Sequence, residues 1–275
     1  MSNGSLVAVL ASGSSGNATL FWSEGSGLLV DAGLSVAELR YRLGRVGAGL
    51  DQLDGVVLTH LHGDHTNPSV LNACSRLDIP VYAPPNAVPL LVGENSWAQT
   101  SGFCRVLRAL DSPPMRVGKF SITWFTVPHD SPGETVGLGV TCPTEQGPRR
   151  VVLATDLGHM PDYLLPHFDD ADVLILEANH DERMLWESDR PYWLKSRIAS
   201  PRGHLSNAQA AAALKRILSR RVRPPAAIVL AHLSQECNTP ETALTHVRRV
   251  LDSDPSAPLQ IVAADQFEPV VLELG

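Results

Sequence analysis

The chain has 275 residues, of which 44% are hydrophobic and 19% are charged, and its formal net charge at pH 7 is −7. Its longest apolar runs are strand-length, well under the roughly 20 residues that a membrane-spanning helix needs, which excludes such helices. The acidic balance excludes a uniformly basic nucleic-acid-binding surface but leaves room for a local basic face.

Short apolar segments between Gly- and Ser-rich turns predict strands, and apolar residues at helical spacing predict helices. The expected strands cover residues 5–11, 18–22, 27–31, 55–59, 120–127, 136–141, 151–155, 172–176, 226–231, 260–263 and 270–273, with one more ending at residue 82. The expected helices cover residues 36–43, 207–219 and 241–251, with two further helices flanking the strand that ends at residue 82.

Strands cluster before and after helices in each half of the chain, which predicts an α/β fold of two packed sheets with helices outside. No linker or repeat interrupts the sequence, so we expect one domain over residues 1–275. The first apolar segment has no preceding basic residue and makes a poor secretory signal. We therefore expect a cytoplasmic protein, with buried and reduced thiols at Cys74, Cys104, Cys142 and Cys237.

The segment THLHGDH at residues 59–65 directly follows an apolar strand. Crowding three imidazoles and a carboxylate is unfavourable without a shared charge partner, and a divalent metal such as Zn²⁺ or Mn²⁺ accepts these ligands. His60 and His62 send their rings to one side of an extended segment, whereas Asp64 and His65 can turn to a second ion. The alternative is a solvated His-rich loop, which the apolar flank disfavours.

Three isolated residues, His129, Asp156 and His232, each follow a predicted strand. Taken singly, each could be an ordinary core or rim residue. Taken together, they supply three more ligands, including a carboxylate able to bridge two ions. Two bridged metal ions that ionise a shared water form a hydrolytic centre.

This pattern resembles metallo-β-lactamase-fold hydrolases, whose hallmark is HxHxDH followed by separated His, Asp and His. More narrowly, the chain resembles the YycJ branch, also called WalJ or VicX. The matching segments are LASGSSGNATL (10–20), LLVDAGLS (28–35), VVLTHLHGDH (56–65), VPHDSPGETVG (127–137), LATDLG (153–158), LILEANHDERML (174–185), RGHLSNAQAA (202–211) and LAHLSQECN (230–238). The resemblance implies a four-layer αββα sandwich with a dinuclear site at one edge.

The resemblance also implies two divalent metal ions per chain, Zn²⁺ or Mn²⁺, with Fe²⁺ compatible. It assigns the first metal to His60, His62 and His129, and the second to Asp64, His65 and His232, with Asp156 bridging. Relatives usually have a Gly soon after the last His of the motif, whereas this chain continues with Thr66, Asn67 and Pro68. We expect Asn67 to cap a helix that begins at Pro68.

Two further segments gain roles from the resemblance. Asp31 is expected to hydrogen-bond a metal-binding imidazole and so orient its ring; the alternative is a turn aspartate. In the loop at residues 12–17, Ser14, Ser15 and Asn17 are expected to face the phosphates of the substrate. The alternative is a plain hairpin turn.

The segment GHLS at residues 203–206 is similar to the Gly-His-Ser segment of ribonuclease Z-type phosphodiesterases, in which the His protonates the leaving oxygen. Imidazole suits this step because it titrates near neutral pH. We therefore expect His204 as a catalytic acid, Glu177 as its carboxylate partner and Asp64 as a further catalytic group. Arg202 and Ser206 are expected to contact the substrate. The alternative for His204 is a loop residue near a helix N-cap.

Nine Lys and Arg residues and no Asp or Glu lie between Arg190 and Arg223, together with Tyr192 and Trp193. A positive lip concentrates a phosphate backbone, and an aromatic ring can stack on an unpaired base. A solvated helix face explains the cluster near Arg220 equally well, but explains the earlier residues less well.

The sequence therefore predicts a metal-dependent phosphodiesterase acting on nucleic acid, DNA in preference to RNA, with no membrane association. The resemblance implies 5′→3′ exonuclease activity on DNA. Two alternatives stay open. One is a phosphodiesterase for small cyclic or nucleotide substrates, and the other is a metal-binding regulatory accessory protein with little turnover.

Overall fold

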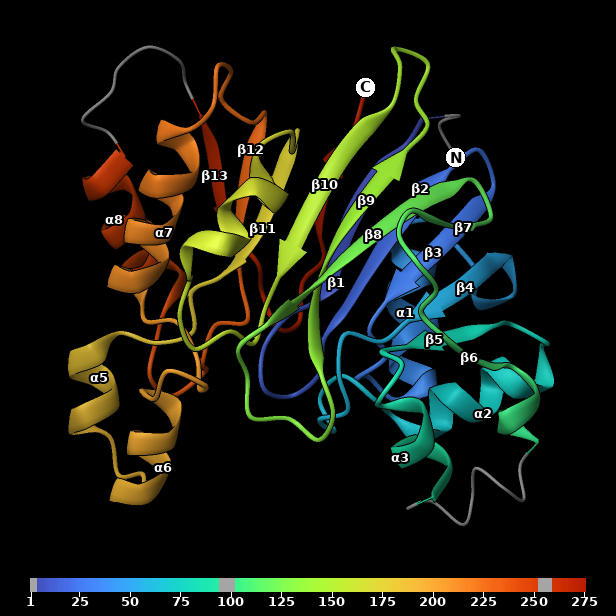
Figure 1. Cartoon of the computed structure of the whole chain (residues 1–275), viewed down its shortest axis with the longest axis horizontal. Coiled ribbons are helices and arrows are strands. Elements are labelled where there is room, and N and C mark those ends of the chain that lie inside the picture. Colours follow the sequence, from blue (N-terminus) through green and yellow to red (C-terminus); the bar gives the residue numbers. More distant parts are fainter. Residues whose placement is uncertain (1–3, 94–101, 252–258) are drawn as a thin grey trace.

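The computed structural model describes residues 4–93, 102–251 and 259–275. Within them, two mixed sheets of seven strands each lie face to face (Figure 1). The first sheet contains, in spatial order, β14 (Val270–Glu273), β1 (Leu6–Ala11), β2 (Ala18–Ser23), β3 (Ser26–Val30), β4 (Leu53–Val57), β5 (Val81–Ala83) and β6 (Leu107–Ala109). The second contains β13 (Gln260–Ala263), β12 (Ala227–Ala231), β11 (Val173–Glu177), β10 (Arg149–Ala154), β9 (Thr135–Cys142), β8 (Phe120–Val127) and β7 (Met115–Val117).

Helices cover the outer face of each sheet. The helices are α1 (Val36–Arg45), α2 (Pro68–Arg76), α3 (Val88–Gly93), α5 (Glu182–Glu187), α6 (Tyr192–Ile198), α7 (Asn207–Ser219) and α8 (Pro240–Leu251), with short 3₁₀ helices η1 (Leu50–Gln52), η2 (Phe103–Arg105) and η3 (Asp162–Phe168). Helices α1 and α2 pack on the first sheet, and α7 and α8 pack on the second. The predicted four-layer αββα sandwich is confirmed. No helix in the described ranges has the length and apolar content to cross a bilayer.

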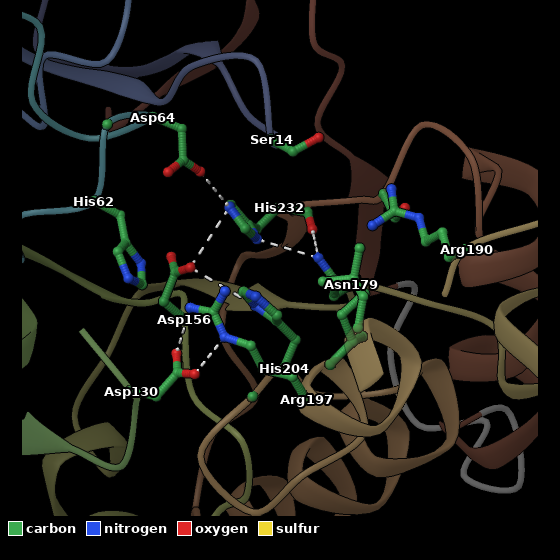
Figure 2. Close-up of a pocket in the computed structure, with 15 residues that line it drawn as sticks. Ser14, His62, Asp64, Asp130, Asp156, Asn179, Arg190, Arg197, His204 and His232 are labelled. Carbon is green, nitrogen blue, oxygen red and sulfur yellow. Dashed lines mark hydrogen bonds and ion pairs between the residues drawn. The ribbon is translucent and has the colours of Figure 1, made fainter. Parts of the chain in front are cut away.

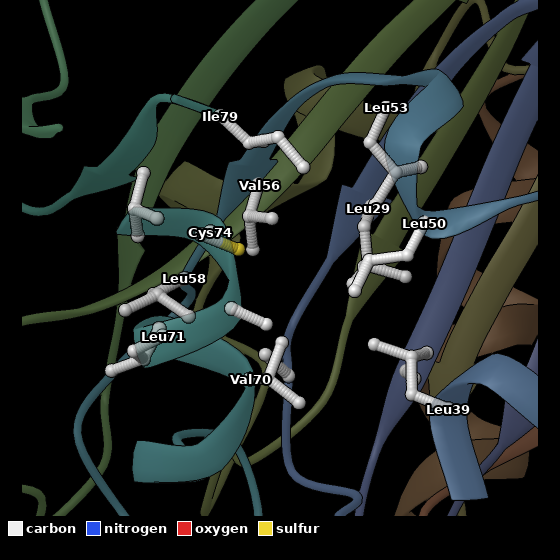
Figure 3. Close-up of a cluster of buried hydrophobic side chains, with 14 of the residues drawn as sticks. Leu29, Leu39, Leu50, Leu53, Val56, Leu58, Val70, Leu71, Cys74 and Ile79 are labelled. Carbon is white, nitrogen blue, oxygen red and sulfur yellow. The ribbon is translucent and has the colours of Figure 1, made fainter. Parts of the chain in front are cut away.

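Strand β3 illustrates how the sequence builds these layers. Successive strand side chains point to opposite faces. Leu28 accordingly enters the apolar cluster between the two sheets, whereas Leu29 enters the cluster under the first helical layer. Figure 3 shows Leu29 facing Leu39 of α1, with Val70 of α2 beside them. Because both faces of the strand are covered, its last three residues, Leu28–Val30, form a continuous apolar run.

Most predicted elements are confirmed, and β8, α7, β13 and β14 have the predicted bounds. Asn67 caps α2 by accepting a hydrogen bond from the Ser69 amide, and Pro68 starts that helix as expected. The structure adds two short helices, α5 and α6, which the sequence analysis left unassigned. They pack through a small separate apolar cluster and therefore lack the long apolar stripe that predicts a helix.

None of the four cysteines, all of which lie in the described ranges, forms a disulfide bond. Cys74, Cys142 and Cys237 are buried, and burial raises the pKa of the Cys74 and Cys142 thiols to about 12. The prediction of burial is wrong for Cys104, which is exposed. Cys104 lies on η2, a single 3₁₀ turn that buries the neighbouring Phe103 instead.

Candidate metal centre

The ends of several strands bring ionisable side chains to one edge of the sandwich. Adjacent parallel strands place their carboxyl ends at the same edge of a sheet, which is where α/β proteins bind ligands. Strands β3 and β4 are parallel, as are β10, β11 and β12. The side chains at these ends and at the end of β8 are Asp31, His60, His129, Asp156, Glu177 and His232.

Three of these residues have a left-handed backbone. The φ angles are 63° at Asp31, 57° at Asp156 and 56° at His232. Asp31 and His232 directly follow their strands, and Asp156 is the second residue after its strand. Asp and His adopt this conformation more readily than bulky residues, and strained conformations of this kind concentrate at functional sites. The sharp turn re-aims each side chain from the strand direction toward the edge.

His60, His62 and His129 form a cluster of facing ring nitrogens. His62 Nδ1 lies 3.2 Å from His60 Nε2 and 3.2 Å from His129 Nε2. Burial lowers the pKa of all three imidazoles, so they are neutral and carry lone pairs. One ring nitrogen cannot hydrogen-bond well to both neighbours. Nitrogens spaced about 3.3 Å apart are what a tetrahedral zinc with Zn–N bonds of about 2.0–2.1 Å requires, so these residues fit a divalent cation.

A second cluster joins Asp64, His65, Asp156 and His232. Asp64 Oδ2 lies 3.2 Å from His232 Nε2 and 3.6 Å from His65 Nε2. Asp156 Oδ2 lies 3.1 Å from His65 Nε2, outside hydrogen-bonding geometry, and this buried oxygen has no hydrogen-bond partner among the described residues. The other oxygen, Oδ1, lies 3.6 Å from His232 Nε2 and 3.7 Å from His129 Nε2. Asp156 therefore faces both clusters.

The charges of the second cluster call for a cation. Although burial favours the neutral acid, His232 and His65 hold the pKa of Asp156 well below its usual value. Burial also opposes charge on His232, yet Asp156 and Asp64 raise its pKa to about 10. Without metal, a protonated imidazole thus supplies the positive charge between the carboxylates. A bound metal cation would supply that charge instead. The seven ligands expected from the sequence meet in these two clusters, which can hold divalent cations.

Asp31 orients His65. Its Oδ2 lies 2.7 Å from His65 Nδ1, and its Oδ1 accepts a hydrogen bond from the Thr59 amide at 2.8 Å. With Nδ1 occupied in this way, His65 turns Nε2 toward the two carboxylates of the second cluster. Such contacts fix the tautomer and the orientation of a metal-binding imidazole.

Close backbone packing holds the loop that carries Asp64. A Cβ atom on Gly33 would lie 1.7 Å from the carbonyl oxygen of Asp64, so only glycine fits there. We expect Gly33→Ala to displace Asp64 and to weaken zinc binding about 10- to 100-fold, as loss of a group supporting a metal ligand does. Competition with a chromogenic chelator measures this. Gly63→Ala is the matched control, because a Cβ there meets nothing within 4 Å; equal zinc affinity of the two variants would contradict this reading.

Glu177 contacts two imidazoles from beneath the site. Its Oε1 lies 2.7 Å from His204 Nδ1 and 3.2 Å from His232 Nδ1, and its Oε2 accepts hydrogen bonds from the Leu157 and Leu205 amides. Burial alone raises the pKa of this carboxyl, but His204 and His232 lower it to about 2. Glu177 is fully buried and is not among the residues that line the cavity. It therefore acts as a positioning residue for both rings.

A cavity of about 300 Å³ opens over the two clusters (Figure 2). Its lining includes His62, Asp64, Asp156, His204 and His232 from the expected site, and also Asp130, Asn179, Arg190, Arg197 and Ser234. Arg190 and Arg197 belong to the basic block of the sequence, which does not by itself assign them to the site. Asp130 and Asn179 are not predicted from the sequence, although Asp130 directly follows His129 and Asn179 lies two residues after Glu177.

The serine-rich loop at residues 12–17 supplies one residue that lines the cavity and one buried residue that hydrogen-bonds to the metal cluster. Ser14 lines the cavity, whereas Ser15 is exposed and its amide binds Gln266. Asn17 is buried, and its Nδ2 lies 3.2 Å from the Asp64 carbonyl oxygen and 3.0 Å from His65 Nε2. Contrary to the expected phosphate contact, Asn17 therefore supports residues of the metal cluster, because the loop turns its amide side chain inward.

The two residues flanking His204 also differ from expectation, since neither lines the cavity. Ser206 caps α7 by accepting a hydrogen bond from the Gln209 amide, and its hydroxyl donates to Glu182. The guanidinium of Arg202 donates to the carbonyl oxygen of His129 at 2.8 Å. Both side chains hold the loops around the site in place.

The basic block divides between two ends of the molecule. Helix α7 begins beside His204 and leads away from the site toward the start of β12, so its last turn lies at the opposite edge. There, Arg216 pairs with Asp162 and Arg220 pairs with Asp169. The solvated-face interpretation thus accounts for the later residues, and only the segment from Arg190 to Arg202 lies near the cavity.

Comparisons with known proteins agree with this geometry. The profile of the "Beta-lactamase superfamily domain" matches residues 27–230. Exodeoxyribonuclease WalJ of Streptococcus pneumoniae serotype 2 (strain D39 / NCTC 7466) is 31% identical over 256 residues, which cover 90% of this chain and 88% of WalJ. Exodeoxyribonuclease YycJ of Bacillus anthracis is 30% identical over 270 residues, which cover 92% of this chain and 97% of YycJ.

The fold has solved counterparts as well. The metallo-β-lactamase-fold protein YhfI from Bacillus subtilis superimposes with a TM-score of 0.67 at 19% identity, covering 98% of this chain and 99% of YhfI. This fold implies divalent metal binding, for which the His and Asp clusters supply the side chains. The chain therefore belongs to the β-lactamase superfamily, as a metallo-β-lactamase-fold hydrolase of the WalJ/YycJ branch.

Proposed function

We propose that the protein is a metal-dependent DNA exonuclease that hydrolyses phosphodiester bonds in the 5′→3′ direction. Two relatives of about 30% identity over nine-tenths of the chain are named exodeoxyribonucleases, which supports DNA as the substrate. The observation that carries the chemistry is the pair of His204 and Glu177 beside the metal clusters, because a site that only stores metal needs no proton donor.

The donor sets suit two divalent ions, Zn²⁺ or Mn²⁺, with Fe²⁺ compatible. The proposed ligands are His60, His62 and His129 for one ion and Asp64, His65 and His232 for the other, with Asp156 shared. Ions bound there would supply an ionised water and neutralise phosphate charge.

The side chains of the cavity divide the remaining tasks. His204 Nδ1 is held by Glu177, so Nε2 is the nitrogen that can donate a proton to the leaving alkoxide oxygen. Asp64 lines the cavity and is placed to accept a hydrogen bond from the attacking water. Arg190 and Arg197 lie at the rim, where a guanidinium can bind a phosphate oxygen.

A substrate panel tests this function. Protein loaded with Mn²⁺ or Zn²⁺ is offered DNA labelled at the 5′ or the 3′ end, RNA of the same sequence, and bis(p-nitrophenyl) phosphate. We expect stepwise release of nucleotides from the 5′ end of DNA, slower cleavage of RNA, and loss of cleavage with EDTA. His62→Ala should lower metal content and activity together, because it removes one of the three facing nitrogens.

The panel also separates the alternatives. Cleavage of the small ester alone would indicate a phosphodiesterase for small substrates. Absence of cleavage from every substrate, with metal bound, would indicate a metal-binding accessory protein. Release of nucleotides from the 3′ end would overturn the proposed direction.

A further inference from the structure

We propose that the segment formed by α5 and α6 binds unpaired bases of the DNA strand that enters the cavity. This inference rests on the proposed function and adds a site and a substrate preference to it. The segment stands apart from the sheets at one end of the molecule, beside the edge that carries the metal clusters (Figure 1).

The inner face of this segment is packed and its outer face is aromatic. Leu185 and Ile198 pack with Cys237 in a small apolar cluster that is separate from the three main apolar clusters of the protein. The outer rings stay in solvent, since Tyr192 is 77% exposed and Trp193 is 66% exposed. Most of the surface of both rings is therefore available to a ligand.

Trp186 extends the aromatic surface from α5. It is 46% exposed, and its ring centroid lies 6.0 Å from that of Tyr192. The rings of Trp186 and Tyr192 thus lie together, and Trp193 directly follows Tyr192 on α6. We call these three exposed side chains the aromatic patch. Contiguous exposed apolar surface on a folded domain marks an interaction site.

The position of the aromatic patch points to a strand on its way into the cavity. Tyr192 and Trp193 lie between Arg190 and Arg197 in sequence, and both arginines line the cavity (Figure 2). Leu194, which follows Trp193 on α6, lines the cavity too. A nucleotide next to the scissile phosphate would therefore reach α6.

The charge of the segment suits a phosphate backbone. Arg190 pairs with Glu236, and Arg197 pairs with Asp130, so these two charges are partly compensated. Lys195 donates to the carbonyl oxygens of Trp186 and Ser188, and within the described ranges no carboxylate pairs with it. Arg202 likewise donates to a carbonyl oxygen. Of the two, Lys195 lies on α6 together with Tyr192 and Trp193, so a cation without a carboxylate partner among the described residues stands on the same helix, where phosphates would be attracted.

Aromatic rings bind only bases whose faces are free. In a duplex each base is stacked on its neighbours, whereas an unpaired base can stack on Trp or Tyr regardless of its identity. The aromatic patch should therefore favour single-stranded or frayed ends over blunt duplex ends, with little sequence preference.

Binding without cleavage tests the inference. Metal-loaded full-length protein is titrated with a labelled 15-nucleotide oligothymidylate carrying phosphorothioate linkages, and with a blunt duplex of the same linkages, by fluorescence anisotropy. Trp193→Ala should weaken binding of the single strand about five- to tenfold, the usual effect of losing one stacked base. Trp193→Phe should restore most of it, and duplex binding should change less than about twofold. Tyr41→Ala, an equally exposed aromatic on α1, is the matched control and should change nothing.

Two binding results would overturn the inference: Trp193→Ala binds the single strand as tightly as the unchanged protein, or it loses as much affinity for the duplex as for the single strand. Light scattering gives a third: if Trp193→Ala is a monomer and the unchanged protein an oligomer, the aromatic patch is a protein interface. Hydrolysis of bis(p-nitrophenyl) phosphate by Trp193→Ala should match that of the unchanged protein, which shows that the variant is folded. If the unchanged protein does not cleave DNA, the proposed function fails. If it cleaves DNA but the variants bind alike, only this inference fails.

Discussion

Replacing His204 by alanine should leave both metal clusters intact and slow hydrolysis of a natural DNA phosphodiester roughly 10²- to 10⁴-fold, the usual contribution of a positioned acid. The ring contacts Glu177 through Nδ1 at 2.7 Å, and it lies outside the ligand set proposed for the metals. Its loss therefore removes the proton donor without removing a ligand. Single-turnover cleavage together with metal analysis measures the two effects separately.

The choice of substrate makes this result specific. p-Nitrophenolate leaves without protonation, so hydrolysis of bis(p-nitrophenyl) phosphate should fall by less than about threefold in His204→Ala if acid catalysis follows leaving-group basicity. His159→Ala is the matched control, because His159 is an exposed imidazole bound to the Pro201 carbonyl oxygen and lies outside the cavity lining. Equal losses on both substrates would show that His204 supports the site's structure instead of donating a proton.

Glu177→Gln should reproduce part of this loss by another route. The amide keeps the shape of the side chain but cannot hold two imidazoles as an anion does, and both His204 and His232 contact Oε1. We therefore expect slower turnover with unchanged KM for DNA, and weaker metal binding than in His204→Ala. If Glu177 positions only His204 and not His232, the metal content of Glu177→Gln should equal that of the unchanged protein, which would contradict this expectation.

The second large effect is expected from Asp156→Asn. Its two oxygens lie 3.1 Å from His65 Nε2 and 3.6 Å from His232 Nε2, at the meeting point of the two clusters. A neutral amide removes the negative charge that both cations would share, so metal content should drop and DNA cleavage should fall at least about 100-fold. Mass spectrometry of the dialysed protein measures the metal content.

A carboxylate at the rim provides the control for this variant. Asp130 also lines the cavity, but it is bound to Arg197, and its nearest imidazole contact is His129 Nε2 at 3.8 Å. Asp130→Asn should keep its metal. If Asp156→Asn also retains a full complement of metal and activity, the assignment of Asp156 to the metal centre is wrong.

The fold could be predicted because its signals are local. Strand β3 ends in residues that are apolar on both faces, the HLHGDH segment follows the end of β4 after two intervening residues, and α7 carries a capping box at Ser206 and Gln209. Each of these patterns depends on neighbours within a few residues, so it is visible without tertiary structure. The strand-end positions of His129, Asp156 and His232 are of the same kind.

Other site residues could not be predicted because their surroundings come from distant parts of the chain. Asn17 supports Asp64 across 47 residues, and Arg202 reaches the carbonyl oxygen of His129 across 73 residues. Polar side chains in loops choose among many partners, and the sequence specifies only that a partner is needed. Only the packing of the loops decided that these two side chains support the site from outside the cavity.

By itself, the sequence determined the layered fold, the ionisable residues at the strand ends and the resemblance that ties them to metal-dependent hydrolysis. Periodicity and motif spacing encode these features along the chain. The tertiary structure alone decided that the basic block divides between two edges of the sandwich, and that Arg190, Leu194 and Arg197 line the cavity while Tyr192 and Trp193 stay exposed. The reason is that a helix and its neighbouring loops distribute residues that are adjacent in sequence over separate surfaces, and only the packing of those elements shows which surface meets the site.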